Sequence, residues 1–168
     1  MLLGAFLLIA ILGQNPGPEP ASAHQRLAER FVTAATPERM PSMDSGTDVM
    51  ADALVRANPG READARRIAR EMDECMSRHG HAAMRQAAIE AALAFDNEQL
   101  ERLISFVEMR SARQREGASN RIPPDWEAAR QDFGRWMYSI GGQPSAIALA
   151  RRCSGEMEAS MAAAGLRD

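Results

Sequence analysis

Residues 95–107, which read FDNEQLERLISFV, decide the fold class of this chain. Asp96 is a residue type that favours the N-cap of a helix, and Gln99 follows at the spacing of a capping box. Apolar side chains then recur at helical spacing, at Leu100, Leu103, Ile104, Phe106 and Val107. Because this stripe stops after Arg110, we predict an amphipathic helix that begins after Asp96 and buries one face.

The helical period continues on both sides of this stretch, while the alternation typical of strands is almost absent. Apolar stripes predict further helices over residues 25–35, 48–57, 61–79, 82–95, 124–140 or 125–140, and 144–161. We therefore predict an all-α fold, a small irregular helical bundle of about six helices.

Glycine and proline set several of the predicted helix ends. Gly80 follows the stripe of residues 61–79 at the place of a C′ glycine, where a helix stops. Residues 42–47 form a break before the helix expected to begin at Asp48. Pro144 suits the first position of the last helix. We expect that helix to bury Ile147, Ala150, Cys153, Met157 and Met161.

The N-terminus predicts a secretory signal. Residues 2–12 read LLGAFLLIAIL, an apolar run too short to span a bilayer, which takes about 20 residues. A small-x-small cleavage site follows at residues 21–23. We expect residues 1–23 to be a signal peptide, cleavage between Ala23 and His24, and residues 24–168 to form a single α-helical domain. The alternative is an uncleaved anchor or a buried N-terminal helix.

Cys75 and Cys153 are the only cysteines. An exported chain meets an oxidising compartment, where an even pair of cysteines favours a disulfide. The two lie on the apolar stripes of different predicted helices, which can face each other in a bundle. The alternative is two free cysteines that pack as small apolar side chains.

His79 and His81, on either side of Gly80, form the candidate metal site. Imidazoles close to Cys75 and two methionines offer ligand types that copper and zinc accept. Residues two apart on a helix point about 200° apart, so these imidazoles converge only if Gly80 breaks the helix. The alternative is a polar helix terminus, where histidine suits the negative end of the helix dipole.

Charge and motifs exclude several function classes. The 168 residues carry a formal net charge of −3, so the overall charge of the chain does not favour binding to nucleic acid. A basic stretch after the central helix suits an anionic lipid or phosphate surface, but interleaved glutamates favour a solvated helix face. It comprises Arg102, Arg110, Arg113, Arg115 and Arg121.

No sequence motif of a nucleotide-binding loop, serine hydrolase or zinc protease is present. We expect no catalytic residues, no resident metal and no cofactor, although an enzymatic function stays open.

Residues 95–106 resemble the phrase F-T-x-E-E-L-x-x-L-I-x-F, which is typical of a bacterial exported family known as domain of unknown function 2059. The resemblance implies a signal peptide followed by an all-helical domain of about this length, and brings no activity or catalytic residues. The chain departs from the family after the phrase. Val107 replaces a second aromatic residue, and Met109, Arg110 and Ala112 stand where the family has Ser, Pro and Gly.

Two function hypotheses follow. The first is an exported periplasmic protein that is not catalytic, binds another envelope protein or a small apolar ligand, and meets the membrane only during export. The second is a periplasmic copper or zinc protein that uses His79 and His81.

Overall fold

The computed structural model describes residues 22–36, 44–117 and 121–167, and these residues form helices and short connections without a strand. The predicted all-α fold of about six helices is confirmed. The α-helices are α1 (Ala23–Ala35), α2 (Asp44–Ala57), α3 (Glu62–Ala92), α4 (Asn97–Arg115), α5 (Glu127–Ser139) and α6 (Pro144–Ala164). Two 3₁₀ turns, η1 (Pro124–Trp126) and η2 (Ile140–Gly142), flank α5.

The predicted signal peptide lies outside the described residues, apart from Ser22 and Ala23. Among the helices that are described, none is both long enough and apolar enough to cross a membrane.

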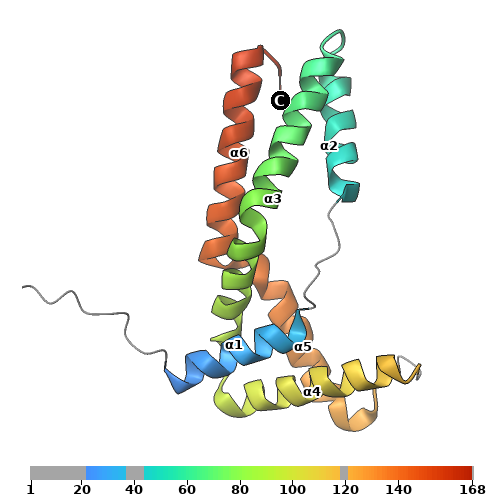
Figure 1. Cartoon of the computed structure of the whole chain (residues 1–168), viewed down its shortest axis with the longest axis vertical. Helices are drawn as coiled ribbons and strands as arrows, with labels where there is room; N and C mark the ends of the chain where they lie inside the picture. The colour runs from blue at the N-terminus through green and yellow to red at the C-terminus, as the bar shows by residue number, and fades with distance from the viewer. Residues whose placement is uncertain (1–21, 37–43, 118–120, 168) are drawn as a thin grey trace, which may run out of the picture.

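Helix α3 is the long central helix of the molecule (Figure 1). Helix α2 runs alongside its N-terminal part and α6 runs along most of its length, while α1 and α4 lie across its C-terminal end, close to α5. At 31 residues, α3 extends about 46 Å at 1.5 Å per residue. It therefore links two packing regions that have few direct contacts with each other.

The larger region, which we call the aromatic core, joins α1, α4 and α5 to the end of α3. The rings of Phe31 and Trp136 meet edge to face, with 4.7 Å between their centroids. The Trp136 indole N–H donates a hydrogen bond to the Ala88 carbonyl at 3.0 Å. This buried indole has its polar atom satisfied, and it ties α5 directly to α3.

The smaller region contains two clusters along the rest of α3. Ala65, Ile68 and Ala69 of α3 pack against α2 and against Met161 of α6. Cys75, Leu149 and Cys153 form a separate cluster between α3 and α6. Small side chains on α3 allow close approach of its neighbours, but they bury little apolar area per residue.

The predicted capping box at the start of α4 is confirmed. The Asp96 carboxylate accepts from the Gln99 backbone N–H at 2.8 Å, and the Gln99 side-chain oxygen accepts from the Asp96 N–H at 3.0 Å. The five apolar residues of the predicted stripe are all buried in the aromatic core. The local signal and the tertiary packing therefore agree along this helix.

The prediction that Gly80 ends a helix is wrong. The two helices expected over residues 61–79 and 82–95 are one, because α3 continues through Gly80 to Ala92. A mid-helix glycine costs only about 1 kcal/mol relative to alanine. Both flanks of Gly80 are packed, since Cys75 contacts α6 and Ala88 lies in the aromatic core, and this packing outweighs the local preference.

Two further expectations need correction. Helix α2 begins at Asp44, about one turn before the expected Asp48. In α6 the buried residues are Ala146, Leu149, Cys153 and Met161, whereas Ile147 is 38% exposed and Ala150 is exposed. Ile147 is six residues before Cys153, which places it about 240° away around the helix, so it cannot share the cysteine's face.

A carboxylate of α3 caps the start of α6. The Glu90 side chain accepts from the Ser145 backbone N–H at 3.1 Å and from its hydroxyl at 2.6 Å. These bonds, the hydroxyl first, lower the pKa of Glu90. The carboxylate satisfies an N–H that has no partner within its own helix, and it lies at the positive end of the helix dipole.

The far end of α6 is fixed by Asn58, which lies in the turn between α2 and α3. Its side-chain oxygen accepts from the Arg167 N–H at 2.7 Å, and its amide N–H donates to the Arg167 carbonyl at 3.0 Å. Gly165 makes this return possible, because it ends α6 with a φ of 62°, in the left-handed region that glycine adopts without strain.

We predict that Trp136→Ala lowers the free energy of unfolding by about 3–5 kcal/mol, because it empties the centre of the aromatic core. The matched control is Tyr138→Ala on the same helix, where the side chain is 95% exposed and the expected change is within about 0.5 kcal/mol. Chemical denaturation followed by circular dichroism measures both. Similar losses for the two variants would contradict the described packing of α5.

We predict that Glu90→Gln destabilises the protein at pH 7 and has a shrinking effect in acid. The folded-state pKa of Glu90 is below its usual value of 4.5, so its charge stabilises the fold above that pH. This contribution is lost as the pH falls through the folded pKa. Urea unfolding of both proteins across pH 3–7 tests this, with the exposed Glu158→Gln as the control. A difference that is independent of pH would contradict it.

Candidate functional site

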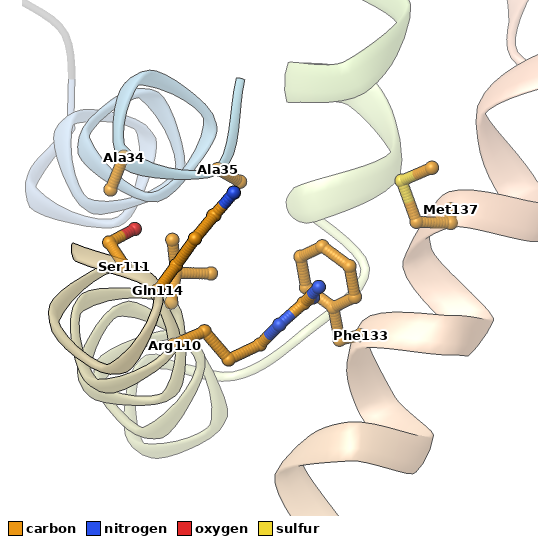
Figure 2. Close-up of a pocket in the computed structure, with 8 residues that line it drawn as sticks. Ala34, Ala35, Arg110, Ser111, Gln114, Phe133 and Met137 are labelled. Atoms are coloured by element: carbon orange, nitrogen blue, oxygen red, sulfur yellow. The ribbon is translucent and has the colours of Figure 1, made fainter. Parts of the chain in front are cut away.

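A groove of about 450 Å³ opens where α1 ends beside α4 and α5 (Figure 2). Three elements supply its walls: α1 at its last turn, the C-terminal half of α4, and the middle of α5. The lining residues are Ala34, Ala35, Val107, Arg110, Ser111, Gln114, Phe133 and Met137.

The groove continues the buried face of α4. Val107, Arg110, Ser111 and Gln114 follow one another at spacings of three and four, so they share one side of the helix. The earlier part of this side is buried under α1. Beyond Val107 the same side becomes polar, and α1 ends at Ala35. Within the described residues, a mixed surface of polar and apolar groups therefore lines the groove.

Arg110 is the one charged side chain among the groove-lining residues. Its guanidinium lies 5.3 Å from the centre of the Phe133 ring and 5.7 Å from that of Phe106, within the range of cation–π attraction. In the described part of the chain it forms no ion pair. The stacked guanidinium thus keeps its N–H donors for another group.

The opposite wall of the groove is apolar. Phe133 is partly buried, and Met137 is 54% exposed although it lies next to the fully packed Trp136. Ala34 and Ala35 add only methyl groups from α1. Figure 2 shows the Gln114 side chain extending toward Ala35 and the Arg110 side chain extending toward Phe133, on either side of the open space.

The other arginines of the basic stretch do not gather in this groove. Arg102 pairs with Glu98 at 2.9 Å and lies 3.9 Å from the Asp132 carboxylate. Arg113 and Arg121 line a separate cavity of about 740 Å³, together with Glu127 and Pro124. Of this stretch, only Arg110 lines the groove.

The predicted disulfide is confirmed. Cys75 of α3 and Cys153 of α6 are bonded, with a Cα–Cα separation of 5.7 Å and no exposed surface on either residue. Leu149 and partly buried methionines of α3 surround the bond. The bond closes a sequence separation of 78 residues and fixes α6 to the middle of α3.

The geometry that the metal hypothesis required is not present at His79 and His81. Because α3 is continuous through Gly80, the two imidazoles point to different sides of the helix. Cys75 is held in the disulfide and offers no thiolate. Within the described residues, no three side chains of His, Cys, Asp or Glu gather to hold a metal ion.

The predicted cleavage site lies in the first turn of α1. Ser22 is the N-cap of α1, and its hydroxyl accepts from the Gln25 N–H at 3.1 Å, while Ala23 is the first helical residue. Cleavage between Ala23 and His24 would therefore remove this cap. His24 would still anchor the helix, because its imidazole hydrogen-bonds to the Asn97 side-chain oxygen at 2.7 Å and to the Leu93 carbonyl at 3.3 Å. These bonds, the one to Asn97 first, raise the pKa of His24.

We predict that removing the disulfide through Cys75→Ala with Cys153→Ala lowers the free energy of unfolding by about 4–5 kcal/mol, because the unfolded chain gains the entropy of a long open loop. Denaturant midpoints with and without the cross-link measure the loss. The wild-type chain unfolded in the presence of a reductant is the control that keeps both sulfur atoms. Equal midpoints for oxidised and reduced protein would show that the bond adds nothing.

No known protein family, curated protein or solved structure matches this chain. The similarity of residues 95–106 to domain of unknown function 2059 thus stays a prediction.

Proposed function

We propose that this protein is exported to the oxidising compartment of a bacterial envelope, the periplasm, where it acts without catalysis as a binding protein. The single observation that carries the proposal is the Cys75–Cys153 disulfide, which is buried between α3 and α6. Structural disulfides form and persist in oxidising compartments, while cytosolic reductants keep thiols reduced.

The position of the bond strengthens this argument. The cluster around the bond has Leu149 and the two cysteines as its buried members, and Met72, Met76, Ala83 and Met84 pack against it partly buried. A cross-link here adds to a small local cluster and restricts the unfolded chain. The stability of such a protein depends on the oxidation of its two cysteines. Export to an oxidising compartment would supply that condition.

The N-terminal sequence supports the same destination. Residues 2–12 have the length and composition of a signal-peptide core, and residues 21–23 supply a small-x-small cleavage site. The resemblance of residues 95–106 to an exported family points the same way.

The groove beside Arg110 supports a binding role. It is a concave surface that combines apolar walls with a few polar groups, which is the usual composition of a small-molecule site. Its volume of about 450 Å³ lies in the range of sites that hold small ligands. A small ligand with an apolar part is therefore favoured over a purely polar one.

The experiment is expression of the full chain in a Gram-negative bacterium, followed by fractionation and intact mass measurement. We expect a periplasmic protein that starts at His24 and weighs two hydrogens less than its reduced form. Leu8→Arg, which interrupts the apolar run, should leave the full-length chain in the cytoplasm, whereas Leu8→Ile should behave as wild type. Full-length wild-type protein with free thiols in the cytoplasm would contradict the proposal.

A further inference from the structure

We propose that the groove between α1, α4 and α5 binds an amphipathic monocarboxylate, a molecule with one carboxylate head and a short apolar tail. Arg110 binds the head, and the tail lies against Phe133 and Met137. This inference rests on the proposed function, because it names the ligand class of the binding role.

The charge of the groove indicates a monoanion. Arg110 is the one charged residue in the lining, and it forms no ion pair in the described part of the chain. One guanidinium balances one negative charge, so a doubly charged phosphate would keep an excess charge in a partly apolar site. The planar guanidinium also matches a carboxylate in a bidentate geometry.

Contacts with two aromatic rings favour carboxylate binding by Arg110. Contacts of its guanidinium with the rings of Phe106 and Phe133 restrict a long side chain that would otherwise lose much rotamer freedom on binding. The guanidinium carbon lies 5.7 Å and 5.3 Å from the centres of these two rings, and the guanidinium carries five N–H donors. A carboxylate can approach these donors from the groove.

Neutral polar groups stand beside Arg110 on the same side of α4. The Ser111 hydroxyl and the Gln114 amide both line the groove, and each can donate to a carboxylate oxygen. In the described residues, neither side chain is engaged in another hydrogen bond. The head group would therefore meet up to three donors from one helix.

The apolar wall of the groove contacts the apolar tail of the ligand in this proposal. Met137 is 54% exposed and Phe133 is partly buried, and both line the groove. Methionine adapts its shape to a flexible alkyl chain. A volume of about 450 Å³ accommodates roughly 15 atoms of the size of water, so a tail of medium length fits better than a long lipid chain.

The test is a titration of the ¹⁵N-labelled, disulfide-bonded protein with octanoate, followed by amide chemical shifts. We expect saturable shifts at Ala35, Ser111 and Gln114, and none near the disulfide. Acetate, which has the head alone, and octanol, which has the tail alone, should each bind at least 10-fold more weakly. Equal responses to octanoate and octanol would overturn the proposal, as would the absence of a saturable shift with millimolar octanoate.

Variants locate the site. Arg110→Gln should weaken octanoate binding about 10-fold or more, because it removes a charge-assisted hydrogen bond. Arg115→Gln is the matched control, since Arg115 is an exposed arginine of the same helix outside the groove and should bind as wild type does. Arg110→Lys should bind with intermediate affinity. Equal weakening in Arg110→Gln and Arg115→Gln would show a general charge effect and overturn the assignment.

A second variant leaves Arg110 intact. Ala35→Leu places a larger side chain at the end of α1, inside the groove, and should abolish the octanoate-dependent shifts while the spectrum stays that of a folded protein. Unchanged octanoate binding by Ala35→Leu would place the ligand elsewhere. Failure of octanoate to bind a periplasmic, disulfide-bonded protein refutes this inference alone, whereas a reduced cytoplasmic protein refutes the proposed function.

Discussion

The fold depends on how one long helix holds its neighbours along its whole length. Helix α3 packs against α2 and α6 through small residues and against the aromatic core at its end. At the middle of α3, its buried contact with α6 consists of Leu149 and the disulfide, surrounded by partly buried methionines. The Cys75–Cys153 bond is therefore the constraint that fixes α6 to the middle of α3.

The aromatic core needs no such constraint. Its aromatic rings interlock, the Trp136 indole is hydrogen-bonded to Ala88, and the capping box at Asp96 sets the start of α4. The aromatic core also supports the groove, because Phe133 contacts Phe106 of the core and Arg110 contacts Phe133. Among the described residues, α1 ends at Ala35 while α4 continues to Arg115, and the groove lies at that point.

Local sequence signals predicted the elements whose tertiary packing agrees with them. The capping box and the apolar stripe after Asp96, the start of α6 at Pro144 and the facing cysteines of two stripes all belong to this class. The continuity of α3 through Gly80 could not be predicted in this way. It results from packing on both flanks, which outweighs a local preference of about 1 kcal/mol.

Long-range polar contacts were also beyond the reach of periodicity. Glu90 caps a helix that begins more than fifty residues later, and Asn58 binds the backbone of Arg167 near the C-terminus. Neither pair has a spacing that a motif could reveal. One feature of the sequence is related to the groove. The apolar stripe of α4 stops after Arg110, whereas the helix continues to Arg115. An amphipathic stripe that turns polar before its helix ends indicates a face that is left uncovered.

The central claim is that the disulfide is the main fixture of α6 at the middle of α3, where the buried packing is limited to Leu149 and the two cysteines. Amide hydrogen exchange of the oxidised and the gently reduced protein under native conditions tests it most directly. We predict that reduction accelerates exchange strongly in α6 and α2 and leaves α1, α4 and α5 protected. Exchange that is equally slow in α6 with and without the bond would contradict the claim, and so would a loss of protection that spreads uniformly over all six helices.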